Sequence, residues 1–165
     1  MPRLGSFLVC EKLVIDQQNK PTIISVFQSI AALVPEGQQM PNDTIGANPW
    51  AIFCEWFFSS DDDFSKKFEE VIEVLMPDGS PSPIRGRLAF NEIVKSGQGT
   101  RAYVNMFGMP ISQTGFLRVN VWLEADSVRV TDVSSYLIKI EHSKQPPMPN
   151  DGGTLVPTLT QTKPS

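Results

Sequence analysis

The stretch from Gly115 to Glu124, with the sequence GFLRVNVWLE, limits the fold of this chain more than any other. Every second residue is small or apolar, and the residues between them are mostly polar or aromatic. This period of two is the pattern of a β-strand with one buried face. A strand cannot satisfy its own backbone N–H and C=O groups, and one sheet alone leaves its apolar face in water. We therefore expect paired neighbouring strands and a second layer that covers Gly115, Leu117, Val119, Val121 and Leu123.

The length and composition indicate one globular domain built from short elements. The chain has 165 residues, 41% of them hydrophobic and 19% charged, which is enough for one sizeable core. The 14 prolines and 11 glycines favour many turns and therefore β-structure over helices. We expect residues 1–142 to form this domain, and residues 143–165, a Pro- and Thr-rich segment with little apolar content, to be a disordered tail.

Further strands are expected along the rest of the chain, about eight in all, at the turn spacing of an antiparallel β-sandwich. A short helix near residues 30–34 and an amphipathic helix over residues 67–76 are the alternatives at two places, but the Val and Ile content favours strands. Residues 84–94 and 100–107 are expected to pair with each other across a Gly-containing hairpin. The remaining predicted strands are residues 6–16, 22–34, 50–58 and 67–76, and the chain returns through residues 128–133 to a last strand at 135–142.

Residues 50–58, WAIFCEWFF, are apolar on both faces. This pattern suits a central strand covered on both sides, or one whose outer face meets a partner. The connection before it, from Pro35 to Pro49, is long for a compact domain, and loops of this length are usually functional or mobile.

The charge balance and the apolar runs exclude several classes of partner. The net charge of −4 provides no field that attracts nucleic acid or anionic lipid, so we expect neither as a partner. The first residues lack a signal-peptide core, and no apolar run approaches a membrane span. We therefore expect a cytoplasmic protein in which Cys10 and Cys54 are reduced thiols, with a Cys10–Cys54 disulfide as the less favoured alternative.

Acidic loops form a weak candidate for calcium binding. If consecutive strands run in opposite directions, the loops that carry several aspartates share one end of the domain. Their carboxylates could then supply some of the six to eight oxygen ligands that Ca²⁺ takes. Acidic loop tips are more commonly only solvated, and no loop has an ordered ligand series, so no metal site is assigned. The residues concerned are Asp16, Asp61, Asp62, Asp63, Asp126 and Asp132.

No catalytic set stands out, and we expect no enzyme activity and no cofactor. His142 is the single histidine, so it cannot form a His-based metal site, and Cys10 or Cys54 with His142 is a nucleophile and base without a supporting motif. No nucleotide-binding, serine-hydrolase or zinc-protease motif is present. A solvated sheet face explains the glutamates better than a glycosidase pair does; they are Glu69, Glu70, Glu73 and Glu92.

Two side-chain groups have both a structural and a binding interpretation. Arg85, Arg87, Lys95 and Arg101 would cluster on the predicted hairpin and meet an anion, but basic residues also protect sheet edges, which we favour. Aromatic residues of the strand at 50–58 would form a sugar-stacking platform, although a core needs the same residues; they are Trp50, Trp56 and Phe58.

Two segments resemble a family of small uncharacterised bacterial and phage-associated proteins. The first is LVCEKLVIDQQNKPTIISVF, and the second is GMPISQTGFLRVNVWLE, which is similar to the closing hairpin of that family. The resemblance covers about residues 6–142 and implies an immunoglobulin-like β-sandwich of unknown function, without catalytic residues to transfer.

These observations predict a non-enzymatic binding or assembly module. It would recognise another protein, or a second copy of itself, through an exposed sheet face or through the Pro35 to Pro49 loop. The alternative is a module that binds Ca²⁺ or carbohydrate through loops at one end.

Overall fold

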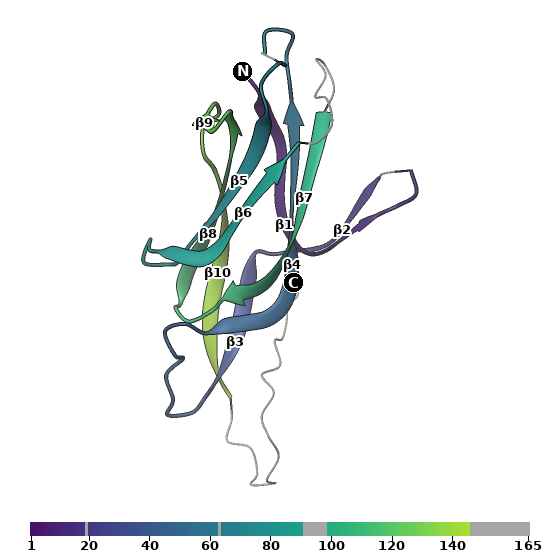
Figure 1. The fold of residues 1–165 in the computed structure, drawn as a ribbon. Helices are drawn as coiled ribbons and strands as arrows, with labels where there is room; N and C mark the ends of the chain where they lie inside the picture. Colours follow the sequence, from purple (N-terminus) through teal and green to yellow (C-terminus); the bar gives the residue numbers. More distant parts are fainter. Residues whose placement is uncertain (19, 63, 91–98, 146–165) are drawn as a thin grey trace.

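In the computed structural model the chain is all-β, and its strands form two sheets (Figure 1). The structure describes residues 1–18, 20–62, 64–90 and 99–145, so the expected disordered tail lies outside the described residues from residue 146 onward. Within this part of the chain there are ten strands, against about eight expected. They are β1 (Arg3–Ile15), β2 (Pro21–Val26), β3 (Ser29–Pro35), β4 (Ile45–Phe57), β5 (Phe68–Leu75), β6 (Pro81–Ala89), β7 (Gly99–Pro110), β8 (Gly115–Ala125), β9 (Val128–Arg129) and β10 (Ser134–Gln145).

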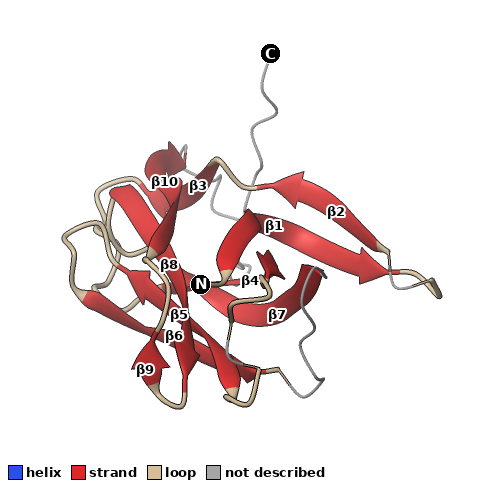
Figure 2. Ribbon diagram, turned by 90° about the horizontal axis from the view of Figure 1, so that it is seen from above, coloured by secondary structure: helices blue, strands red, loops and turns tan. Residues whose placement is uncertain are grey.

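The strands divide into a four-stranded and a six-stranded sheet, here called sheet A and sheet B. Sheet A has the order β2-β1-β4-β7, and sheet B has the order β3-β10-β8-β5-β6, with β9 paired to β8. Figure 2 shows the two sets of strands from above. Side chains from the two sheets meet in one core: the rings of Phe58 and Phe68 lie 4.9 Å apart between centroids, and Phe7 contacts Tyr136 edge to face.

The strand with the clear alternation, β8, occupies the middle of sheet B. β8 lies between β10 and β5, and its alternate residues Leu117, Val119, Val121 and Leu123 are all fully buried. The expected alternation is therefore confirmed. The strand expected at 67–76 is also confirmed, as β5, and the helix alternative there is wrong because both edges of β5 are paired, with β6 and with β8.

The single strand expected at residues 22–34 is wrong, because the chain changes sheets in the middle of it. Phe27 N–H donates to Val9 O in sheet A at 2.9 Å, and the next carbonyl, of Gln28, accepts from Lys139 N–H in sheet B at 3.0 Å. The change of sheet lets β3 run parallel to β10, so the sheets are not wholly antiparallel as expected. The short helix considered at residues 30–34 is also wrong, since β3 covers them.

Two expected hairpins are also wrong, because the two strands of each lie in different sheets. β6 pairs with β5 and β7 pairs with β4, so the strands at 84–94 and 100–107 belong to different sheets. The closing hairpin implied by the resemblance fails in the same way, because β7 lies in sheet A and β8 in sheet B. In both places consecutive strands belong to opposite layers, which cover each other's apolar faces.

The packing around Gly108 in β7 leaves no room for a side chain. Its φ of +75° is in the left-handed region, and a Cβ there would lie 2.3 Å from Ile45 Cγ2. Gly79 has a similar φ of +85°, with no atom within 4 Å of the same position. Because a left-handed L-residue costs about 1–2 kcal/mol, we expect Gly79→Ala to lower the free energy of unfolding by that amount and Gly108→Ala to lower it further. Urea denaturation of both variants measures the difference; equal losses would mean that Ile45 moves aside freely.

Candidate functional site

The structure does not bring together the nucleophile and base considered from the sequence, Cys10 or Cys54 with His142. Cys54 projects from β4 into the core between the sheets, and Cys10 lies on the other face of sheet A. Both thiols are buried and free. Burial raises the pKa of each, and for Cys54 the neighbouring Glu70 carboxyl raises the pKa further. A thiol with a raised pKa is rarely ionised at neutral pH, and the protonated thiol is a poor nucleophile.

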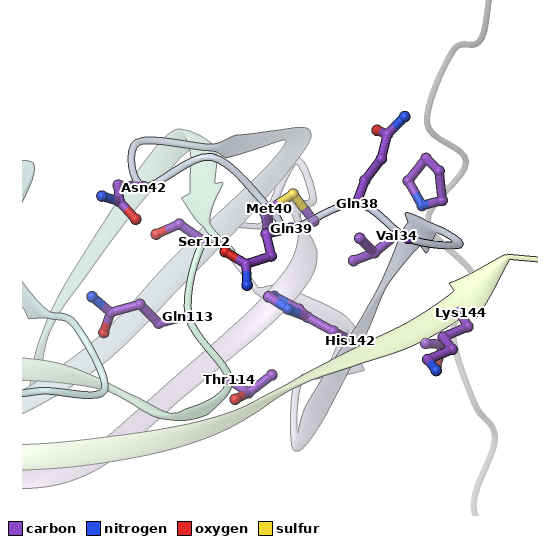
Figure 3. A pocket seen from close by; sticks show the side chains of 13 residues that line it. Val34, Gln38, Gln39, Met40, Asn42, Ser112, Gln113, Thr114, His142 and Lys144 are labelled. Carbon is purple, nitrogen blue, oxygen red and sulfur yellow. The ribbon is translucent and has the colours of Figure 1, made fainter.

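His142 instead lines a cleft of about 530 Å³ at the end of β3 and β10 (Figure 3). Its Nε2 lies 2.7 Å from Ile111 O, so Nε2–H donates to that carbonyl. The described residues that line the cleft include no cysteine. They are mainly amides and hydroxyls, together with Lys144: Gln38, Gln39, Asn42, Ser112, Gln113, Thr114 and Ser143.

The cleft shows no activated nucleophile. Ser112 is 9% exposed, and its Oγ makes no hydrogen bond within the described part of the chain. A serine nucleophile would instead share a hydrogen bond with its base. Gln113 is also occupied, because its amide exchanges hydrogen bonds with Asp78 in the β5–β6 turn. The connection expected from Pro35 to Pro49 supplies one wall of the cleft, but it is shorter than expected, since β3 reaches Pro35 and β4 begins at Ile45.

The acidic residues do not gather as the calcium hypothesis required. Asp16 follows the far end of β1, where its carboxylate accepts from Gln18 N–H and Lys20 N–H at 2.8 Å in a local turn. Asp62 lies at the opposite end of the same strand, 2.8 Å from the Met1 ammonium. Asp63 lies outside the described residues. Among the described residues no group of three or more potential metal ligands is present.

The glutamates of β5 separate by strand alternation, so the interpretation as one solvated face is wrong for Glu70. Glu69 and Glu73 face outward and are half-buried, whereas Glu70 points into the core and is 0% exposed. Its Oε2 accepts from Trp56 Nε1–H at 2.6 Å, but its Oε1 makes no hydrogen bond in the described structure. Burial raises the pKa of Glu70 despite the Trp56 contact. Glu92 lies outside the described residues.

The described basic residues do not form the anion-binding cluster that was the less favoured interpretation. Arg85 and Arg87 lie on β6, an edge strand of sheet B, as edge protection requires. Arg101 lies on β7 in the other sheet, where its Nε is 3.0 Å from Glu55 Oε1. Lys95 is outside the described residues.

The favoured interpretation of the aromatic residues at 50–58 as core residues is confirmed, and the sugar-platform alternative is wrong. Trp50, Trp56 and Phe58 are 1%, 0% and 2% exposed. Trp122 on β8 is the one tryptophan of the three that is partly exposed, and it lines a groove on the outer face of sheet B. Strand alternation placed Trp122 opposite Leu117 and Leu123, so the signal for an outward tryptophan was present in the sequence.

The outer face of sheet A, which points away from sheet B, is largely apolar. Strand register places Leu8, Phe53 and Tyr103 side by side on it, with Val26 and Phe107 nearby. Phe53, between Leu8 and Tyr103 in the register, is 5% exposed. The residues at the margin are open, with Val26 at 44%, Tyr103 at 46% and Phe107 at 82%. We call these five residues the outer apolar face.

The β1–β2 hairpin extends this surface beyond the two sheets. Both views show it projecting away from the other strands (Figures 1 and 2). It exposes Val14 and Ile24, each 41%. A two-stranded hairpin is only marginally stable without a further surface, so its apolar side chains favour a contact with something outside this chain.

Comparison with known proteins adds no relationship from which a site could be transferred. Within the described residues no helix is long and apolar enough to cross a membrane. No family model matches the chain, and no curated protein matches it in sequence.

Proposed function

We propose that the protein is a non-enzymatic assembly module that acts through protein–protein contacts, and that its partner is a second copy of the same chain. The observation that carries this proposal is the outer apolar face of sheet A. Monomeric proteins rarely expose contiguous apolar patches unless these serve an interaction. Tyrosine and phenylalanine are also the residue types enriched at the centres of protein interfaces.

The position of this face at a sheet edge favours a second copy as the occupant. β7 is the edge strand of sheet A, and its outer backbone groups can accept another strand. Tyr103 and Phe107 lie two residues on either side of Asn105, and all three face outward. If β7 pairs antiparallel with β7 of a second copy, with Asn105 on the two-fold axis, each Tyr103 lies opposite Phe107 of the second copy. Such cross-strand aromatic pairs stabilise sheets by about 0.2–1 kcal/mol each.

We infer that the two facing sheets form an immunoglobulin-like β-sandwich, supported by their shared core and by the many antiparallel pairs. A cytoplasmic location is supported by the two free, buried cysteines. The proposed relationship to small bacterial and phage-associated proteins rests on the two sequence segments alone.

Size-exclusion chromatography with light scattering tests the assembly. We expect the full chain to be a dimer at high micromolar concentration. The double variant Tyr103→Asp, Phe107→Asp buries two charges at the interface and should weaken dimerisation at least about tenfold, or about 1.4 kcal/mol. Its melting temperature as a monomer should be unchanged, because both side chains are exposed.

Leu137→Asp is the matched control. Leu137 is 48% exposed on the outer face of sheet B, so this variant adds one aspartate at an apolar position about as exposed as Tyr103, away from the proposed interface. It should remain dimeric. A wild-type chain that stays monomeric, or a double variant that dimerises as tightly as the wild type, would contradict the proposal.

A further inference from the structure

The outer face of sheet B has a groove of about 340 Å³ between β5, β6 and β8. Trp122 forms one wall, and Arg85 and Arg87 of β6 form the opposite one, with Val71 and Glu73 of β5 between them. The backbone of Gly86, between the two arginines in sequence, also lines the groove. An aromatic ring and charged groups of both signs therefore face one small volume.

The Trp122 side chain is held in place by neighbouring charges. Its Nε1–H donates to Glu124 Oε1 at 3.1 Å, and the other oxygen of Glu124 accepts from Arg87 at 2.8 Å. Arg87 also donates to Glu69 at 3.0 Å. Glu124 is only 9% exposed, whereas the Arg87 and Glu69 side chains are 54% and 36% exposed, so the Glu124 carboxylate is the fixed group that orients the indole. The indole is thus a preformed flat wall.

Arg85 and Glu73 are opposite each other across β5 and β6 but do not pair. Strand register aligns the two residues, and within the described residues no ion pair joins them. The contact of the Glu73 carboxylate with Asn120 Nδ2 is long, at 3.5 Å. Opposite charges at this spacing usually form a cross-strand pair. Here a strong donor and a strong acceptor instead remain beside the indole.

We propose that this groove binds a neutral saccharide. A sugar hydroxyl both donates and accepts, so adjacent hydroxyls can donate to Glu73 and accept from Arg85 in charge-assisted hydrogen bonds. The C–H face of the ring packs on the indole, whose face carries the negative side of its quadrupole. Glu73 disfavours an anionic ligand and Arg85 disfavours a cationic one, so a neutral polyhydroxylated ring fits both. This site lies on the opposite layer from the proposed dimer interface, and neither proposal depends on the other.

Tryptophan fluorescence gives a site-specific measurement on the full chain. Trp50 and Trp56 are buried, so a spectral change on titration reports mainly Trp122. The probes are soluble hexamers of β-1,4-linked glucose, of N-acetylglucosamine and of galacturonate, with free leucine as a zwitterionic comparison. We expect a saturable change with a neutral hexamer, and weaker or no change with galacturonate and leucine.

Two variants and a control define the outcome. Arg85→Ala, on an exposed edge position, should leave the melting temperature unchanged and reduce affinity at least about tenfold, the loss expected for one charge-assisted hydrogen bond. Trp122→Phe should retain part of the affinity, measured by calorimetry because the reporting indole is lost. Phe116→Ala changes an exposed residue elsewhere on β8 and should retain the full affinity. No response to either neutral hexamer, a preference for leucine or galacturonate, or full affinity in Arg85→Ala would overturn the proposal.

Discussion

Leu117→Ala should lower the free energy of unfolding by about 2–5 kcal/mol, the range measured for large-to-small substitutions in well-packed cores. Leu117 is 0% exposed and lies on β8, which is paired on both sides, so neighbouring strands cannot easily move in to fill the space. The loss therefore includes both the transfer free energy of the missing carbons and a cavity term. Urea denaturation followed by circular dichroism measures it.

Leu137→Ala provides a matched control with the same chemical change. Leu137 lies on the adjacent strand β10, opposite Arg118, and is 48% exposed on the outer face. Removing its side chain creates no enclosed cavity, so we expect a loss below about 1 kcal/mol. If the two variants lost equal stability, the assignment of the inner and outer faces of sheet B would be wrong.

The alternation that identified Leu117 shows what the sequence determines well in this chain. A run such as Leu117, Val119, Val121 and Leu123 specifies a buried strand face through local spacing alone. The same spacing assigns Glu70 to the inner face of β5, between Phe68 and Ile72, but its charge made a solvated position the expected one. The solvated position was predicted from the charge of Glu70, whereas the alternation of β5 predicts a buried one. Glu70 is 0% exposed, so the alternation gave the correct prediction.

Partner choice between strands was not predictable from local pattern. The change of sheet at Phe27 and Gln28 has no glycine or proline to mark it, and it depends on hydrogen bonds to Val9 and Lys139, both distant in sequence. The candidate sites depend on the same information. Arg85 and Trp122 come together only because β5 lies between β6 and β8, and this order follows from how two layers share one core.

Wild-type stability should fall as the pH rises above the ordinary Glu pKa of 4.5, because of the buried carboxyl of Glu70. Burial raises the pKa of Glu70 in the folded state, so the folded chain keeps a proton that the unfolded chain releases. The stabilisation is fully present below the unfolded pKa and is lost as the pH rises through the folded pKa. Within that window the free energy of unfolding falls by about 1.4 kcal/mol per pH unit from this group.

Glu70→Gln isolates this effect because glutamine cannot ionise and its carbonyl can still accept from Trp56 Nε1–H. The stability of the variant minus that of the wild type should increase with pH across the window, when urea denaturation is repeated from about pH 5 to pH 8. Glu69→Gln, one residue away and facing outward, loses only a surface ion pair with Arg87, worth about 0–1 kcal/mol. A constant difference between Glu70→Gln and the wild type at every pH would show that Glu70 is ionised in the fold, with water or a cation reaching it between the sheets.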